Sequence, residues 1–122
     1  MNKLLVSPND TLLNVMKKIN ETGLGLALVV EQDKKLVGMV TDGDIRRAIL
    51  KGLDLKIPVS EVMNREPIVT RTDERHELYR LLHEAKVKRR LPLYGYFKVP
   101  LLDEGGVVKD LLLIPSEQVE YL

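Results

Sequence analysis

The same order of predicted strands and helices occurs twice along this chain. In the first copy, an extended segment at residues 4–7 is held out of the helical region by Pro8, which follows it. Apolar strands are expected at residues 26–30 and 36–40, around a polar turn, and a helix is expected at residues 45–51. A further helix is expected between the first two strands, because Leu12, Leu13, Met16 and Ile19 follow the helical spacing and give it one buried face. The helix at residues 45–51 has a buried face of the same kind, formed by Ile45, Ala48 and Ile49. The order is therefore β-α-β-β-α.

The second copy repeats this order after a short helix expected at residues 59–63. Its first strand is expected at residues 68–70 and its hairpin at residues 99–114, with a turn in the middle. Thr72 or Asp73 can cap the helix that lies between the strand and the hairpin. The buried face of that helix is expected to carry Leu78, Leu81, Leu82 and Ala85.

The offset between the copies changes along the chain. It is 63 residues at the first strands and 72 at the hairpins, so the second copy carries about nine extra residues within residues 86–98. Each copy is too short to close a hydrophobic core alone, since small repeats bury their apolar faces against one another. We therefore expect an α+β fold in which two units, residues 1–58 and 59–122, pack face to face as one module.

The composition argues against several classes of function. The 122 residues are 44% apolar and 30% charged, which is typical of an ordinary soluble domain. A net charge of +1 argues against binding to nucleic acid or to a membrane surface. The absence of cysteine removes disulfides, zinc–thiolate sites and thiol nucleophiles. No apolar run approaches the roughly 20 residues of a membrane-spanning helix, so we expect a soluble, cytoplasmic protein.

The strongest candidate for a binding site lies where the strand at residues 36–40 runs into the next helix. Residues 38–44 read G-M-V-T-D-G-D, which sets a hydroxyl and carboxylates beside the N–H groups of a helix N-terminus. Such an N-terminus favours an anion such as a phosphate. The Thr41 hydroxyl can donate to a phosphate oxygen, and an ionised Asp44, which only accepts, suits the two hydroxyls of a ribose. A purely structural role stays open, with Thr41 or Asp42 as the N-cap and Asp44 stabilising the helix dipole.

The sequence predicts neither a catalytic centre nor a metal site. His76 and His83 lie seven residues apart on one predicted helix, without a third ligand at metal spacing, so both are expected at the surface. Asp42 and Asp44 are paired carboxylates, but no general acid or metal ligand set accompanies them. We expect no catalytic residue, no bound metal and no enzymatic activity.

Residues 86–98 form a basic and aromatic segment. They hold three of the five aromatic residues and five cationic residues. Interleaved cations and aromatic rings can bind single-stranded nucleic acid. Because the segment is short and the chain is close to neutral, packing within the chain or a dimer contact is favoured and nucleic acid is not expected.

These features together resemble a known family, the tandem CBS domain pair or Bateman module. The resemblance lies in the two β-α-β-β-α units, in G-x-x-T-x-x-D at residues 38–44, and in V-S-E-V-M-N at residues 59–64 before the second unit. It covers nearly the whole chain. T-D-G-D-I-R-R at residues 41–47 and I-P-V-S-E-V-M-N at residues 57–64 are similar to the CBS pair that precedes sugar-phosphate nucleotidyltransferase domains.

The resemblance implies a regulatory module that binds an adenosine-containing ligand in the cleft between its units. The ligands of the family include AMP, ADP, ATP and S-adenosylmethionine. On this chain Asp44 would hold the ribose hydroxyls and Thr41 would contact ribose or phosphate. The Met39 backbone and the strand start near Ala27 would flank the adenine.

Further contacts are implied at the edge of this site. The opening strand of the second unit, including Ile68 and Thr70, would complete the pocket. Arg46 and Arg47 could reach phosphates or could simply form a solvated helix face. In the second unit, Asp110, Leu113 and Ser116 stand at the 72-residue offset from Gly38, Thr41 and Asp44. Leucine cannot hydrogen-bond a ligand and serine cannot hold a diol as a carboxylate can, so at most one competent nucleotide site is expected.

The function implied is to sense an adenine nucleotide and to modulate a sugar-phosphate nucleotidyltransferase, either attached or separate. The family also implies a homodimer formed through the helices that flank the cleft. Two rivals stay open. One is a structural or oligomerising CBS module that binds no ligand, and the other is a small enzyme that uses Asp42 and Asp44.

Overall fold

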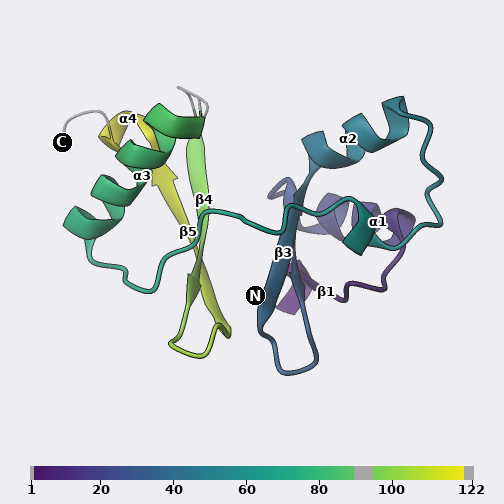
Figure 1. Cartoon of the computed structure of the whole chain (residues 1–122), viewed down its shortest axis with the longest axis horizontal. Coiled ribbons are helices and arrows are strands. Elements are labelled where there is room, and N and C mark those ends of the chain that lie inside the picture. Colours follow the sequence, from purple (N-terminus) through teal and green to yellow (C-terminus); the bar gives the residue numbers. More distant parts are fainter. Residues whose placement is uncertain (1, 90–94, 120–122) are drawn as a thin grey trace. The chain divides into compact units, whose positions relative to one another are not determined.

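The chain forms two compact units, Met1–Pro67 and Ile68–Leu122 (Figure 1). The computed structural model describes residues 2–89 and 95–119, with side chains described except at 86–89. The boundary falls later than the expected one after residue 58, because Val59 and Met63 pack into the core of the first unit. The segment before the second repeat therefore completes the core of the first unit.

The first unit is built on a three-stranded sheet in the order β1-β2-β3. Strand β1 (Leu5–Val6) follows a 3-10 turn, η1 (Asn2–Leu4), and pairs in parallel with β2 (Leu26–Val30). Strand β3 (Leu36–Thr41) returns antiparallel to β2, with Leu26 opposite Thr41. The three predicted strands are confirmed in this order.

Two helices cover the core of this unit, α1 (Leu12–Thr22) and α2 (Asp42–Leu50). Thr11 caps α1, and Gly23 ends it in a left-handed conformation that suits glycine. Helix α2 begins three residues before the predicted start at Ile45, because Thr41 caps it. The side chains that pack together include those of Val6, Leu12, Val15, Ile19, Ala27, Val29, Val40, Ile45 and Ala48.

Two of the predicted core positions on these helices are wrong. Leu13 is 42% exposed and Ile49 is 44% exposed, whereas Val15 is fully buried. Buried residues on α1 are spaced three and four apart, at Leu12, Val15 and Ile19, which follows the helical period. Leu13 lies about 100° around the helix from Leu12 and therefore faces away from the core.

The segment after α2 is fastened to strand β3. A 3-10 turn, η2 (Val59–Glu61), stands where a short helix was expected. Beyond it, Met39 and Asn64 exchange two backbone hydrogen bonds, of 2.9 and 2.8 Å. Gly38 makes this approach possible, since a Cβ atom there would lie 2.6 Å from Met63 Sδ and 3.1 Å from the Asn64 carbonyl oxygen. The glycine of the G-x-x-T-x-x-D motif thus serves packing.

The second unit repeats the order around a two-stranded sheet. Helix α3 (Arg75–Arg89) precedes strands β4 (Tyr96–Leu102) and β5 (Val108–Pro115), and α4 (Ser116–Val119) closes the unit. The predicted strand at residues 68–70 is reduced to one parallel bridge from Thr70 to Leu101. The core side chains of this unit are Leu78, Leu82, Phe97, Val99, Ile114 and Val119.

Some predictions for this unit need correction. Helix α3 begins after the predicted cap positions, and the Thr72 hydroxyl accepts from the Glu74 N–H at 3.1 Å instead. Leu81 is 36% exposed, because Leu78 and Leu82 fill the core side of the helix. The expected insertion at residues 86–98 is divided among the end of α3, residues 90–94, which lie outside the described chain, and the start of β4. Phe97 packs into the core, as packing within the chain predicts.

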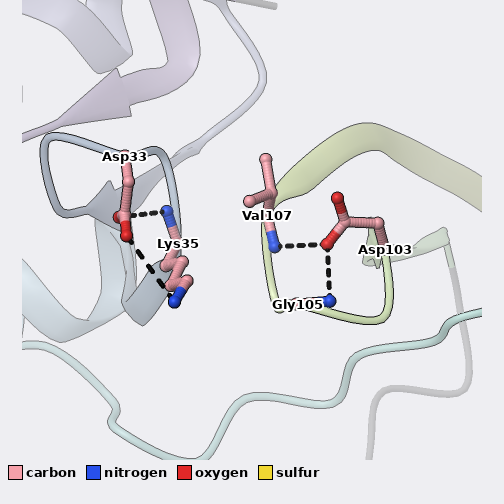
Figure 2. A network of polar contacts seen from close by, with 5 residues as sticks. All are labelled: Asp33, Lys35, Asp103, Gly105 and Val107. Carbon is pink, nitrogen blue, oxygen red and sulfur yellow. Dashed lines mark hydrogen bonds and ion pairs between the residues drawn. The ribbon is translucent and has the colours of Figure 1, made fainter.

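The two hairpins share one turn geometry but differ in length. The Glu31 N–H donates to the Lys35 carbonyl at 3.0 Å, and the Asp103 N–H donates to the Val107 carbonyl at 2.9 Å. Figure 2 shows the acidic side chain of each turn, Asp33 in the first and Asp103 in the second. The paired arm of β4 runs over seven residues against five in β2. The 72-residue offset therefore holds from the turn to the pair Lys98 and Leu113, which matches Leu26 and Thr41, and the second hairpin continues beyond it to Tyr96 and Pro115.

Candidate functional site

Thr41 and Asp44 form a reciprocal capping box at the start of α2. The Thr41 N–H donates to Asp44 Oδ2 at 3.0 Å, and the Asp44 N–H donates to Thr41 Oγ1 at 3.2 Å. The capping alternative is therefore confirmed, and Thr41 is the cap rather than Asp42. Capping does not use up the carboxylate, because an ionised carboxylate offers about four acceptor positions.

Arg47 completes the surroundings of Asp44. Its Nη2 donates to Asp44 Oδ1 at 2.6 Å, and the side chains are 66% and 23% exposed, respectively. Each carboxylate oxygen of Asp44 thus has one partner among the described residues and an acceptor position left for a ligand. Arg46, which the sequence also nominated for phosphate contact, is exposed on a different side of the helix. The sequence contains a signal for this difference between the two arginines, because Arg47 lies three residues from Asp44 and Arg46 lies only two.

The residues predicted to flank an adenine already form contacts within the first unit. The Met39 N–H is donated to the Asn64 carbonyl, so Met39 can contribute its half-buried side chain but not this donor. Ala27 is fully buried and packs in the core of the first unit. Asn64 is a neighbour of the site that sequence reasoning did not place there.

The predicted contacts from the opening strand of the second unit have local partners. Thr70 is 5% exposed, and its hydroxyl donates to the Thr72 carbonyl at 2.8 Å and accepts from the Thr72 N–H at 3.1 Å. Ile68 is half-buried against the core of its own unit. In the structure both side chains support the unit to which they belong.

The greater length of the second hairpin changes which residues stand at the start of the following helix. Thr41 lies opposite Leu26 at the start of β2, and Pro115 lies opposite Tyr96 at the start of β4. A matching hydrogen bond follows each pair, from the Asp42 N–H to the Gly25 carbonyl at 3.0 Å and from the Ser116 N–H to the Gly95 carbonyl at 2.9 Å. The equivalents of Thr41, Asp42 and Asp44 are thus Pro115, Ser116 and Gln118.

By strand pairing Leu113 still corresponds to Thr41, as expected at the 72-residue offset, but at the helix start the corresponding residues also lack a binding site. Proline has neither an N–H nor a hydroxyl, so no capping box can form at Pro115. Gln118 carries no charge, and its Oε1 accepts from the Tyr79 hydroxyl at 2.8 Å. The second unit therefore lacks the carboxylate on which ribose binding is predicted.

The first unit also has an open cavity of about 890 Å³, away from this motif. It is lined by the β1–α1 loop and the β2–β3 turn, including Ser7, Asp10, Lys18 and Asp33. In an antiparallel hairpin this turn lies at the opposite end of β3 from Thr41. None of the predicted ligand contacts lines this cavity.

Metal and membrane features are absent from the part of the chain that the structure describes. There, no group of three or more His, Cys, Asp or Glu residues could hold a metal ion. His76 and His83 are both exposed. None of the described helices combines the length and apolar content needed to cross a membrane.

Comparison with known sequences finds similarity to CBS domains, first at the start of the chain. Residues 1–51 match the family model of the CBS domain. Arabinose 5-phosphate isomerase GutQ of Salmonella typhi is 31% identical over 97 residues, which are 79% of this chain and 27% of that protein. The chain spans between 17% and 29% of the length of the curated relatives that it matches.

Solved structures extend the likeness to both units. A CBS domain protein from Pyrobaculum aerophilum complexed with AMP is similar with a TM-score of 0.72 and 23% identity, over 90% of this chain and 79% of that chain. A CBS domain pair in complex with 5′-methylthioadenosine and S-adenosylmethionine is similar with a TM-score of 0.69 and 19% identity, over 96% of this chain and 87% of that one. The chain therefore has the α+β fold of CBS domain proteins, as the sequence predicts.

Proposed function

We propose that this chain is a regulatory module that binds an adenosine-containing ligand through the first unit, with Asp44 accepting hydrogen bonds from the ribose hydroxyls. The observation that carries the proposal is the Asp44 carboxylate itself. It is fixed by the Thr41 N–H and by Arg47 and keeps an acceptor position on each oxygen. The similar structures that contain AMP or S-adenosylmethionine support this class of ligand.

The ligand would act by shifting a conformational equilibrium of the module. A ligand that binds one arrangement of the chain more tightly than another favours the first by that difference in affinity. The contact between β3 and the segment after α2 offers a route for this effect, because Met39 bonds to Asn64 only two residues from Thr41. No catalytic step is proposed for the module.

The enzyme that the module modulates is proposed to act on a sugar phosphate. The sequence motifs at residues 41–47 and 57–64 favour a nucleotidyltransferase, attached or separate. The relative GutQ is instead named as an isomerase of arabinose 5-phosphate. Adding the purified chain and AMP to each enzyme type and measuring its rate distinguishes these clients.

Ligand binding is tested by thermal unfolding with AMP, ADP, ATP, S-adenosylmethionine and GTP as a guanosine control. A ligand at 100 times its dissociation constant stabilises the folded state by about 2.7 kcal/mol, which raises the melting temperature by roughly 4–8 °C per kcal/mol for a domain of this size or slightly smaller. We expect the adenosine ligands to raise the melting temperature of the wild type and of Asp42→Asn, but not of Asp44→Ala. No shift with any ligand would contradict the proposal.

An exposed apolar group favours a second role, self-association of the first unit. Leu50 at the end of α2 is 79% exposed, and Leu13, Ile49 and Leu53 are each more than 40% exposed. Exposed apolar side chains are typical of interaction sites where they form a contiguous patch. We propose a homodimer that uses this surface. Sedimentation of wild-type and Leu50→Glu protein tests it, with Lys51→Gln as the neighbouring control, and a wild-type monomer at high concentration would exclude it.

A further inference from the structure

Arg47 lies across the first turn of α2, beside the carboxylate proposed to hold the ribose. An ideal Cβ atom on Gly43 would lie 3.3 Å from Arg47 Nη1 and 3.6 Å from Arg47 Nη2. The guanidinium therefore lies next to the space that a side chain at position 43 would occupy, while it donates to Asp44 Oδ1 at 2.6 Å. A side chain at position 43 would crowd it. The bond to Asp44 thus holds the cation where α2 begins, and Gly43 leaves room for it there.

The held guanidinium keeps most of its hydrogen-bonding capacity. An arginine has five N–H donors in a planar fork, and among the described residues Arg47 uses them in one hydrogen bond, to Asp44. The side chain is 66% exposed, so the other donors can reach a ligand from solvent. A planar fork matches the oxygens of a phosphate in a bidentate geometry.

The balance of charge at this turn depends on Arg47. Asp42 and Asp44 place two carboxylates in the first turn of α2, and both would repel a phosphate. Arg47 compensates the charge of Asp44 directly. Among the described residues Arg46 forms no hydrogen bond or ion pair with Asp42 or Asp44, and it lies two residues from Asp44, a spacing at which side chains on a helix do not face each other.

We infer that Arg47 makes this site selective for phosphorylated adenosine ligands, such as AMP, over adenosine and over cationic adenosyl compounds such as S-adenosylmethionine. Asp44 would take the ribose and the free donors of Arg47 would take the phosphate. The sulfonium group of S-adenosylmethionine would meet a like charge where a phosphate meets an opposite one. The inference rests on the proposed function, since it assumes that Asp44 holds the ribose.

Calorimetric titration of AMP and adenosine into wild type and three variants tests this selectivity. We expect wild type to bind AMP about tenfold or more tightly than adenosine, because hydrogen bonds between charged groups are among the stronger polar contacts. Arg47→Gln should lose about tenfold in affinity for AMP and stay within about twofold for adenosine. The matched control Arg46→Gln should change neither affinity by more than about twofold. Gly43→Ala, which keeps every charge but displaces the guanidinium, should weaken AMP binding selectively as well.

The possible outcomes distinguish failure of this inference from failure of the proposed binding function. Tight binding of both ligands, with Arg47→Gln leaving AMP affinity unchanged, would overturn the inference and leave ribose binding at Asp44 intact. Equal losses of AMP affinity in Arg46→Gln and Arg47→Gln would show that only the overall charge of the helix matters, and would also overturn the inference. No binding of either ligand to wild type would overturn the proposed function together with the inference. Unchanged unfolding curves of the variants, expected because exposed ion pairs contribute little to stability, show that each variant is folded.

Discussion

Thr41 and Asp44 bond to each other in both directions, with the Thr41 N–H donating to Asp44 Oδ2 at 3.0 Å and the Asp44 N–H donating to Thr41 Oγ1 at 3.2 Å. The residues proposed to bind the ligand are therefore also the residues that start α2. A substitution at either position acts on stability as well as on binding. Variants that separate the two effects are needed to interpret any loss of binding.

Removing the cap should destabilise the first unit. We expect Thr41→Ala to lower the free energy of unfolding by about 1 kcal/mol, the usual cost of losing a threonine cap. Thr41→Ser retains the hydroxyl and should cost only a few tenths of a kcal/mol. Urea denaturation of the ligand-free proteins measures both values, and equal stability of Thr41→Ala and wild type would show that the capping box contributes nothing.

A methyl group at Gly38 should also destabilise this unit. Its Cβ would lie 2.6 Å from Met63 Sδ and 3.1 Å from the Asn64 carbonyl oxygen, so the segment after α2 must shift away from β3. We expect Gly38→Ala to cost about 1–3 kcal/mol, which is typical of overpacking. The control is Gly105→Ala, whose nearest contact would be an ordinary 3.5 Å from Asp103 Oδ1. Denaturation curves that coincide for these two variants would contradict the account of Gly38.

The two hairpin turns offer a matched pair of backbone substitutions. Lys34 has φ of 65° in the first turn, where Gly106 has φ of 88° in the second. A left-handed conformation costs a residue with a side chain about 1–2 kcal/mol, and a change to glycine removes this cost. Part of the gain in stability is offset, because glycine has more conformational freedom in the unfolded chain. We expect Lys34→Gly to stabilise the protein by up to about 1 kcal/mol and Gly106→Ala to destabilise it by a similar amount. Thermal unfolding of both variants checks the opposite signs.

Asp103 should make stability depend on pH in the acid range. Its Oδ1 accepts from the N–H groups of Val107 and Gly105, each at 2.9 Å (Figure 2). The Val107 bond is the largest cause that lowers the pKa of Asp103 below its ordinary value of 3.8; partial desolvation opposes it, and the Gly105 bond and the Lys109 charge add to it.

The direction of the effect follows from that lowered pKa. Because the folded state binds the proton less readily than the unfolded state does, the stabilisation is complete above the unfolded pKa of about 4. It is lost as pH falls through the lower folded pKa. Asp103→Asn removes this titration, so the variant should lose less stability than wild type between pH 5 and the acid limit of folding. Parallel pH profiles of unfolding for the two proteins would contradict this assignment.

The order of elements was predictable because it depends on local signals. Residues 26–30 read as a buried strand, and all five residues of β2 are buried. Thr41 followed three residues later by an acidic side chain is a capping pattern, so the start of α2 at Asp42 was also available. Residue type alone does not choose between Thr41 and Asp42 as the N-cap, since both suit that position, and the structure gives Thr41.

The length of the second hairpin was beyond the sequence. Both arms are apolar runs, and nothing in such a run marks how many residues pair before the strand ends. The 72-residue offset holds for the paired residues, since Lys98 lies opposite Leu113 as Leu26 lies opposite Thr41, but the second hairpin continues to the pair Tyr96 and Pro115. The contact of Asn64 with Met39 was hidden for a similar reason, since backbone pairing leaves no trace in residue type.

The most direct test of the account follows the backbone amide resonances of 15N-labelled protein during titration with AMP. We expect the N–H signals of Thr41, Gly43 and Asp44 to shift in a saturable way at one ligand per chain, and those of Ser116 and Gln118 to stay in place. Asp44→Asn, which keeps an oxygen acceptor for the cap, should abolish the shifts while preserving the spectrum of the folded chain. Shifts confined to residues outside the start of α2, or no shifts at all, would contradict a nucleotide site at Asp44.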